Sequence, residues 1–283
     1  MTLVLWADGE LVGENQPALS AVDHGVTVGD GVFETCAVDD GRPFALTRHL
    51  RRLAASAAGL GLEAPDEARV REGVAAVLAA APDAGRLRIT VTAGIGPLGS
   101  ARTPGAQTVV VAAAPATAAA TAAVVRSPWT RNERSAVAGL KTTSYAENVV
   151  ALLHAQERGG DEAVLANTVG DLCEGTGSNV FVERGGELVT PRLDTGCLAG
   201  ITRELVLEWG AAEGIPVREA RPGELPFEVL DDVLRGEAHL AITSSVRNLQ
   251  PVVTLDGTSV EAGPLCAVVQ TMFARRRAET VDP

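Results

Sequence analysis

The chain has 283 residues, of which 46% are hydrophobic and 21% charged, enough apolar material for two packed lobes or one large α/β unit. Its formal charge of -12 argues against nucleic acid as a partner, because phosphate backbones are held by basic surfaces. No apolar run approaches the roughly 18 residues of a membrane span. Asp8 and Glu10 interrupt the N-terminal apolar segment, so we expect a cytoplasmic protein that is neither secreted nor membrane-bound.

The first part of the chain mixes predicted strands with predicted helices. Apolar residues on both sides of the turn Asp8-Gly9 predict a β-hairpin over residues 3–12. Three glycines in the segment 23–31 predict tight turns ahead of a strand that runs to Val38. Helical spacing of apolar residues begins near Thr47 and recurs over 66–80, and alternation predicts strands over 86–93 and 108–114.

A segment rich in alanine, threonine and proline, residues 112–123, lacks an apolar stripe and is typical of a linker. We therefore expect an N-terminal α/β lobe over 1–115, a connector over 116–123 and a C-terminal lobe over 124–283. Predicted elements of the C-terminal lobe are strands at 124–125, 163–166, 179–182 and 240–243 and helices at 145–158, 201–209 and 265–277. Interleaved strands and helices indicate an α/β fold class, with α/β or α+β lobes.

Several sequence patterns argue against disulfides, a metal site and dinucleotide binding. Four widely spaced cysteines favour reduced, buried thiols over disulfides or a zinc site, and the four histidines lack metal-ligand spacing, so no metal is expected. The segment Gly94–Gly99 matches GxGxxG after a predicted strand. However, Pro104-Gly105 and another strand follow it, where a dinucleotide site needs a helix.

The chain contains one lysine, Lys141, among 24 lysine and arginine residues. Arginine stays protonated in proteins, whereas a lysine amine can deprotonate and react with a carbonyl. A lone lysine in an arginine-rich chain is therefore a candidate for amine chemistry, although a lysine on a solvated face is the simpler alternative. The single tyrosine, Tyr145, follows four residues later.

Two further segments supply complementary groups. Glu174 precedes a turn of small residues, 175–178, which leaves backbone room for a flat ligand. The loop 196–203 leads into a predicted helix, whose free N–H groups and dipole suit a phosphate. An amine, a carboxylate and a phosphate cradle together describe a site for pyridoxal 5'-phosphate.

With these motifs in this order from about Asp23 to Pro251, the chain resembles the class IV (fold type IV) family of pyridoxal-phosphate enzymes. That family contains branched-chain aminotransferases, D-amino acid aminotransferases and 4-amino-4-deoxychorismate lyase. The resemblance implies a two-domain fold like that of D-amino acid aminotransferase, pyridoxal phosphate as the cofactor, a small-molecule substrate and a homodimer.

The resemblance also implies roles for individual residues. Lys141 would bind the cofactor through its amine and move the Cα proton, Glu174 would pair with the pyridinium nitrogen, and Tyr145 would hydrogen-bond the ring oxygen. The implied phosphate contacts are the side chain of Arg52 in the motif His49-Leu50-Arg51-Arg52-Leu53, the backbone N–H groups of Ile201 and Thr202, and the hydroxyls of Ser245 and Ser244.

The motifs indicate the family more clearly than they indicate which of its activities this chain has. In the motif Phe33-Glu34-Thr35, Thr35 matches the threonine that the lyases carry, whereas branched-chain aminotransferases have glycine at this position. Its hydroxyl would contact the substrate ring or the leaving pyruvate. The alternative is that Thr35 only fills a strand position. Pro97-Leu98 stand where many lyases and D-amino acid enzymes have an arginine for a substrate carboxylate, which makes Arg88 and Arg102 candidates.

We favour 4-amino-4-deoxychorismate lyase. One alternative is an aminotransferase for branched-chain or D-amino acids, because a tyrosine at the position of Tyr145 is typical of the aminotransferases. The other is a non-catalytic relative.

Overall fold

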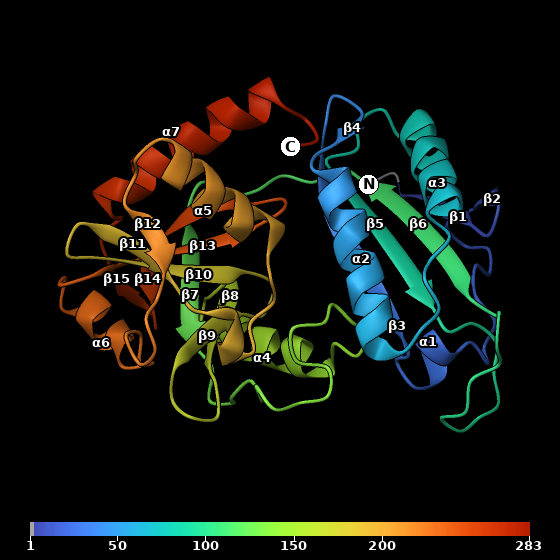
Figure 1. Cartoon of the computed structure of the whole chain (residues 1–283), viewed down its shortest axis with the longest axis horizontal. Coiled ribbons are helices and arrows are strands. Elements are labelled where there is room, and N and C mark those ends of the chain that lie inside the picture. The colour runs from blue at the N-terminus through green and yellow to red at the C-terminus, as the bar shows by residue number, and fades with distance from the viewer. Residues whose placement is uncertain (1–2) are drawn as a thin grey trace. The chain divides into compact units, whose positions relative to one another are not determined.

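The computed structural model describes residues 3–283, which form two compact units (Figure 1). Unit 1 comprises the described residues up to Thr117 together with Leu140–Tyr145 and Thr280–Pro283; unit 2 comprises Ala118–Gly139 and Ala146–Glu279. The division after Thr117 falls inside the expected connector 116–123. Residues 140–145 and 280–283 belong to unit 1, whereas they were expected in the C-terminal lobe. The first segment is hydrogen-bonded to the strand that begins at Gly31, and the second to the start of the helix that begins at Leu46.

Unit 1 is a six-stranded antiparallel sheet with two long helices. Its elements are β1 (Val4–Ala7), β2 (Glu10–Val12), the short α1 (His24–Thr27), β3 (Gly31–Asp39), β4 (Arg42–Pro43), α2 (Leu46–Leu60), α3 (Glu67–Ala80), β5 (Arg86–Thr92) and β6 (Thr108–Ala114). The strands are ordered β2-β1-β6-β5-β3-β4. The predicted hairpin, the two helices and the strands of this part are confirmed.

The helices α2 and α3 cover one face of this sheet (Figure 1). Alternation along β3 turns Val32, Cys36 and Val38 toward them, where they join the core with Leu50 and Leu53. Phe33, Thr35 and Ala37 alternate with these residues and lie on the other face of the strand.

The C-terminal segment caps α2. Ala45, the N-cap residue, has a left-handed backbone and no side-chain cap of its own. Asp282 replaces that cap: its Oδ1 accepts the Thr47 N–H at 2.9 Å and its Oδ2 accepts the Thr47 hydroxyl at 2.5 Å. The Val281 carbonyl also accepts the Ala45 N–H at 2.7 Å. These contacts explain why residues 280–283 belong to unit 1.

Unit 2 is built on a nine-stranded mixed sheet with the path β12-β11-β10-β13-β14-β7-β8-β9, and β15 pairs with β14. Its elements are β7 (Ala122–Arg126), α4 (Ala146–Gln156), β8 (Glu162–Ala166), β9 (Leu172–Gly175), β10 (Asn179–Arg184), β11 (Glu187–Thr190), the 3-10 turn η1 (Leu193–Thr195), α5 (Ile201–Ala212), β12 (Val217–Glu219), α6 (Val229–Leu234), β13 (His239–Ser244), β14 (Asn248–Leu255), β15 (Thr258–Ser259) and α7 (Pro264–Glu279). α5 and α7 pack side by side through Trp209 and Phe273, whose ring centroids are 5.0 Å apart (Figure 1).

The mixed α/β class is confirmed, but several strands of unit 2 were not predicted. β14 contains Pro251, which lacks a backbone N–H and argues against a strand in sequence patterns. β9, β11 and β12 are three or four residues long, too short to show alternation. No helix within residues 3–283 is both long and apolar enough to span a membrane.

The cysteines are free and buried, as predicted. Burial raises the pKa of every one of these thiols, to about 11 for Cys197 and about 12 for Cys266. A raised pKa favours the protonated thiol at neutral pH.

A buried ionic cluster links β3 to α2. The Glu34 side chain is fully buried; Arg52 donates to both of its oxygens at 2.7 Å, and His49 Nδ1 donates to Oε2 at 2.6 Å. Burial alone would raise the pKa of Glu34, but the charge and hydrogen bonds of Arg52 and the hydrogen bond of His49 outweigh it and hold the pKa at about 2. Burial lowers the pKa of His49, which is neutral at pH 7.

This cluster predicts a specific acid dependence. Because the folded pKa of Glu34, about 2, lies below its unfolded value of 4.5, its contribution is complete above pH 4.5 and is lost as pH falls toward 2. Glu34→Gln should lower the free energy of unfolding at pH 7 on the order of 3 kcal/mol. Urea denaturation of both proteins from pH 7 downward measures the difference, which should shrink below pH 4.5. An equal difference at every pH would contradict this account.

Candidate active site

The segment 141–143 pairs with the start of β3 in unit 1. The Phe33 N–H donates to the Lys141 carbonyl at 3.0 Å, and the Thr143 N–H donates to the Gly31 carbonyl at 2.8 Å. Glycine is required at position 31, since an added Cβ would lie 2.8 Å from a carbonyl oxygen of β5 and 3.1 Å from Thr143 Oγ1. The glycines ahead of the strand therefore allow the close approach that brings the single lysine to β3.

The buried ring of Phe33 contacts three functional side chains. Lys141 Nζ lies 4.5 Å from the ring centroid and Arg88 Cζ lies 3.8 Å from it, both as cation–π contacts. The ring of Tyr145 packs edge-on, with its centroid 5.2 Å away. The structure thus brings together two residues expected to hold the cofactor and one arginine expected to bind a substrate carboxylate.

Thr35 lies on the same side of β3 as Phe33, because side chains alternate along a strand. In the β3–β5 register it stands directly opposite Arg88. Thr35 is half-buried, so part of it is accessible on this face of β3.

Arg52 lies on the α2 side of β3. Because Glu34 takes hydrogen bonds from both Nε and Nη2 of Arg52, the guanidinium has a fixed orientation. Sequence reasoning named Arg52 but missed Glu34 and His49. Two sequence features could have indicated this cluster. Glu34 stands between Phe33 and Thr35, and the spacing of His49 and Arg52 puts both on one face of α2.

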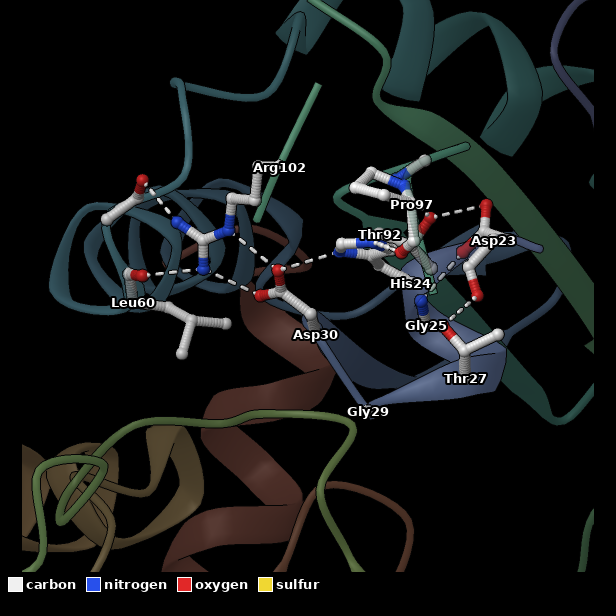
Figure 2. A network of polar contacts seen from close by, with 12 residues as sticks. Asp23, His24, Gly25, Thr27, Gly29, Asp30, Leu60, Thr92, Pro97 and Arg102 are labelled. Carbon is white, nitrogen blue, oxygen red and sulfur yellow. Dashed lines mark hydrogen bonds and ion pairs between the residues drawn. The ribbon is translucent and has the colours of Figure 1, made fainter. Parts of the chain in front are cut away.

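Arg102 is hydrogen-bonded to Asp30 and to two backbone carbonyls (Figure 2). Its Nε and Nη2 donate to both oxygens of Asp30 at 2.6 and 2.7 Å, and its Nη1 and Nη2 donate to the carbonyls of Gly61 and Leu60 at 2.7 and 2.9 Å. Asp30 and two backbone carbonyls together take hydrogen bonds from Nε, Nη1 and Nη2 of Arg102, which makes Arg102 the less favoured of the two arginine candidates. Arg88, which stacks on Phe33 beside Lys141, is the favoured candidate.

The segment matching GxGxxG is held by a histidine (Figure 2). His24 Nε2 donates to the Pro97 carbonyl at 2.8 Å, and a Cβ added at Gly96 would lie 2.4 Å from that nitrogen. β5 ends at Thr92 and the next element is β6, so no helix follows the loop. The rejection of a dinucleotide fingerprint is confirmed by this context.

Glu174 lies in β9 of unit 2 and is held from two directions. Its Oε2 accepts the Leu198 N–H at 2.9 Å, and its Oε1 lies 3.2 Å from Arg131 Nε. Sequence reasoning missed Arg131, which lies 43 positions from Glu174 in a loop without a recognisable motif. A carboxylate fixed in this way can pair with a protonated ring nitrogen.

The N-terminus of α5, at Ile201 and Thr202, has the features of an anion site. Its N-cap residue, Gly200, offers no side-chain cap, and a Cβ there would lie 1.9 Å from Asn179 Oδ1, so the position requires glycine. The first N–H groups of a helix lack intrahelical acceptors, and a phosphate satisfies them.

Serines lie beside this helix end. Gly200 packs against Asn179 of β10, and Asn179 pairs with Thr243 in the β10–β13 register. The end of β13 at Ser244, and Ser245 after it, therefore lie next to β10 as well. The Thr243 hydroxyl is buried without a hydrogen-bond partner among residues 3–283.

The residues present fit pyridoxal phosphate. Taken by itself, unit 1 contains an amine, a tyrosine and two arginines, and unit 2 contains a fixed carboxylate, an uncapped helix N-terminus and hydroxyls. These are the groups that can bond an aldehyde, a ring nitrogen and a phosphate.

Comparison with known proteins gives a consistent result. The family model described as amino-transferase class IV matches residues 31–255. A bifunctional aminodeoxychorismate lyase / D-amino acid transaminase from Mycobacterium tuberculosis is 30% identical, with 94% of this chain and 96% of that protein covered. The fold IV-transaminase CpuTA1 from Curtobacterium pusillum is 32% identical with a TM-score of 0.80, covering 96% of this chain and 98% of that one.

A branched-chain aminotransferase from Thermoproteus uzoniensis, solved with norvaline, is 28% identical with a TM-score of 0.82 and covers 97% of this chain and 93% of that one. These similarities agree with the fold and with the groups in both units. The chain belongs to the class IV aminotransferase family of pyridoxal-phosphate-dependent enzymes.

Proposed function

We propose that this enzyme is a 4-amino-4-deoxychorismate lyase that releases pyruvate and 4-aminobenzoate, a reaction of the folate branch. The observation that carries the proposal is the position of Thr35, a half-buried residue on the side of β3 that carries the ring of Phe33, opposite Arg88. Its similarity to a relative named for this lyase activity supports the proposal.

The side chains divide the work as follows. Bound pyridoxal phosphate supplies a sink for the electron pair left at the substrate Cα. Lys141 would hold the cofactor until the substrate amine takes its place; the freed amine would then remove the Cα proton and return it to the departing enolpyruvyl group, so that the loss of pyruvate leaves an aromatic ring. Glu174 holds the proton on the ring nitrogen, and Tyr145 hydrogen-bonds the ring oxygen.

The remaining residues bind and orient. Arg52, the N–H groups of Ile201 and Thr202, and the hydroxyls of Ser244 and Ser245 hold the phosphate. Arg88 binds a substrate carboxylate while it stacks on Phe33, and Thr35 orients the substrate ring or the leaving group.

A class IV aminotransferase acting on branched-chain or D-amino acids with a 2-oxo acid acceptor is the second candidate. The contact of Tyr145 with Phe33 beside Lys141 favours it, as do the second activity in the name of the mycobacterial relative and the similarity to a branched-chain enzyme. Both candidates use the same groups for the cofactor and differ in the acceptor they require.

We further propose that the enzyme is a cytoplasmic homodimer. Three apolar side chains on one helix, α4, are largely exposed: Val149 at 61%, Val150 at 50% and Leu153 at 54%. Apolar side chains gathered on one helix surface are typical of an interaction site, which supports the dimer.

The two activities separate in one pair of assays. The purified enzyme should form 4-aminobenzoate and pyruvate from aminodeoxychorismate without a 2-oxo acid, because elimination needs no acceptor. The second assay supplies branched-chain and D-amino acids with 2-oxoglutarate. Brisk amino transfer without any 4-aminobenzoate would replace the lyase proposal by the aminotransferase.

Thr35→Gly tests the residue that carries the lyase proposal. Loss of one buried polar contact should raise the barrier to 4-aminobenzoate formation by about 1–3 kcal/mol. Amino transfer should be retained or increased, since glycine opens space beside Phe33. Steady-state rates of both reactions and the absorbance of the bound cofactor measure the effect.

The matched control is Thr35→Ser, which keeps the hydroxyl and should keep most of the lyase activity. If both reactions fell equally in Thr35→Gly, Thr35 would be a strand residue without a role in choosing the reaction.

A further inference from the structure

A continuous set of polar contacts inside unit 2 joins the segments proposed to hold the two ends of the cofactor. We call it the cradle network; its members are Arg131, Asn148, Glu162, Thr176 and Arg247. The sequence assigned a role to none of these residues, although Thr176 lies in the turn 175–178 that follows Glu174. Each contact of the network lies within unit 2.

At one end, the network reaches the ring-nitrogen carboxylate. Arg131 Nε lies 3.2 Å from Glu174, and Arg131 Nη2 donates to Asn148 Oδ1 at 2.7 Å. Asn148 Nδ2 then donates to the Thr176 carbonyl at 2.7 Å. The turn that follows Glu174 is thereby tied to the arginine that holds Glu174.

Glu162, the first residue of β8, is at the centre of the network and only 2% exposed. Its Oε1 accepts hydrogen bonds from the Thr176 hydroxyl and, at 2.9 Å, from the Gly177 N–H. Its Oε2 accepts from Arg247 Nη1 at 2.8 Å. A Cβ added at Gly175 would lie 3.1 Å from Glu162 Oε1, which shows how closely the turn packs on this carboxylate.

At the other end, Arg247 belongs to the turn that carries the phosphate serines. The Arg247 N–H donates to Ser244 Oγ at 3.4 Å, and β13 ends at Ser244. One buried carboxylate therefore joins the turn after Glu174 to the turn that contains Ser244 and Ser245.

We propose that Glu162 is a positioning residue: it sets the separation between Glu174 and the serine turn, so that both engage one pyridoxal phosphate molecule. This inference rests on the proposed roles of Glu174, Ser244 and Ser245. A ligand that bridges two contacts gains affinity only when their separation matches its length. Pyridoxal, which lacks the phosphate, does not bridge them and is insensitive to that separation.

The test is a comparison of two ligands on the full-length protein. Parental protein and Glu162→Gln are stripped of cofactor and titrated with pyridoxal phosphate and, separately, with pyridoxal, following the absorbance of the bound ligand. Glutamine carries an N–H₂ group where Glu162 has an accepting oxygen, so at least one hydrogen bond of the network is lost. The affinity for pyridoxal phosphate should fall about tenfold more than the affinity for pyridoxal.

Two further variants separate positioning from general damage. Glu183→Gln changes another buried carboxylate of unit 2, which accepts the N–H groups of Leu265 and Cys266 at the start of α7, and should leave the ratio of the two affinities unchanged. Arg247→Met removes the half-buried arginine that pairs with Glu162. It should lower the affinity for pyridoxal phosphate more than that for pyridoxal even if Glu162→Gln folds poorly.

The double variant Glu162→Gln/Arg247→Met should lose no more than either single variant, because both break one connection. Equal losses for the two ligands in Glu162→Gln and Arg247→Met, or additive losses in the double variant, would overturn the inference. Parental protein that bound neither ligand, or Glu174→Gln with an unchanged spectrum of the bound cofactor, would instead refute the proposed function.

Discussion

The pairing of residues 141–143 with β3 is the interaction on which the rest of the site in unit 1 depends. It joins the single lysine to a strand that follows the tightly packed glycine segment, and Ser56 on α2 adds a contact by accepting the Lys141 N–H at 3.1 Å. With the backbone fixed at these points, the Lys141 amine meets the Phe33 ring, and Arg88 and Tyr145 reach the same ring. The backbone pairing thus determines which side chains lie around the amine.

Each unit uses a buried carboxylate to hold an arginine near a proposed cofactor contact. In unit 1, Glu34 orients Arg52, and the cationic partner keeps the carboxylate ionised inside the core. In unit 2, Glu162 accepts from Arg247 and from the turn after Glu174. A buried charge is costly unless it is paired and hydrogen-bonded, and both clusters meet this condition at places where geometry matters for binding.

The sequence predicted local features well and distant pairings poorly. Lys141 stood out because it is the only lysine, and most helices and longer strands showed their apolar periodicity. The attachment of residues 140–145 to unit 1 depends on hydrogen bonds to β3, more than 100 positions away, which no local pattern records. Arg131 was missed for the same reason, and no local pattern shows the link of Arg102 to Asp30, which spans 72 positions.

The most direct test of the central claim is to locate the covalently bound cofactor. Borohydride reduction of the purified enzyme, followed by peptide mapping, fixes pyridoxal phosphate to the amine that holds it. The account predicts a yellow protein and a label on the peptide that contains Lys141, since no other side chain can form this bond. A label on the N-terminal amine, or full activity in Lys141→Ala, would contradict it.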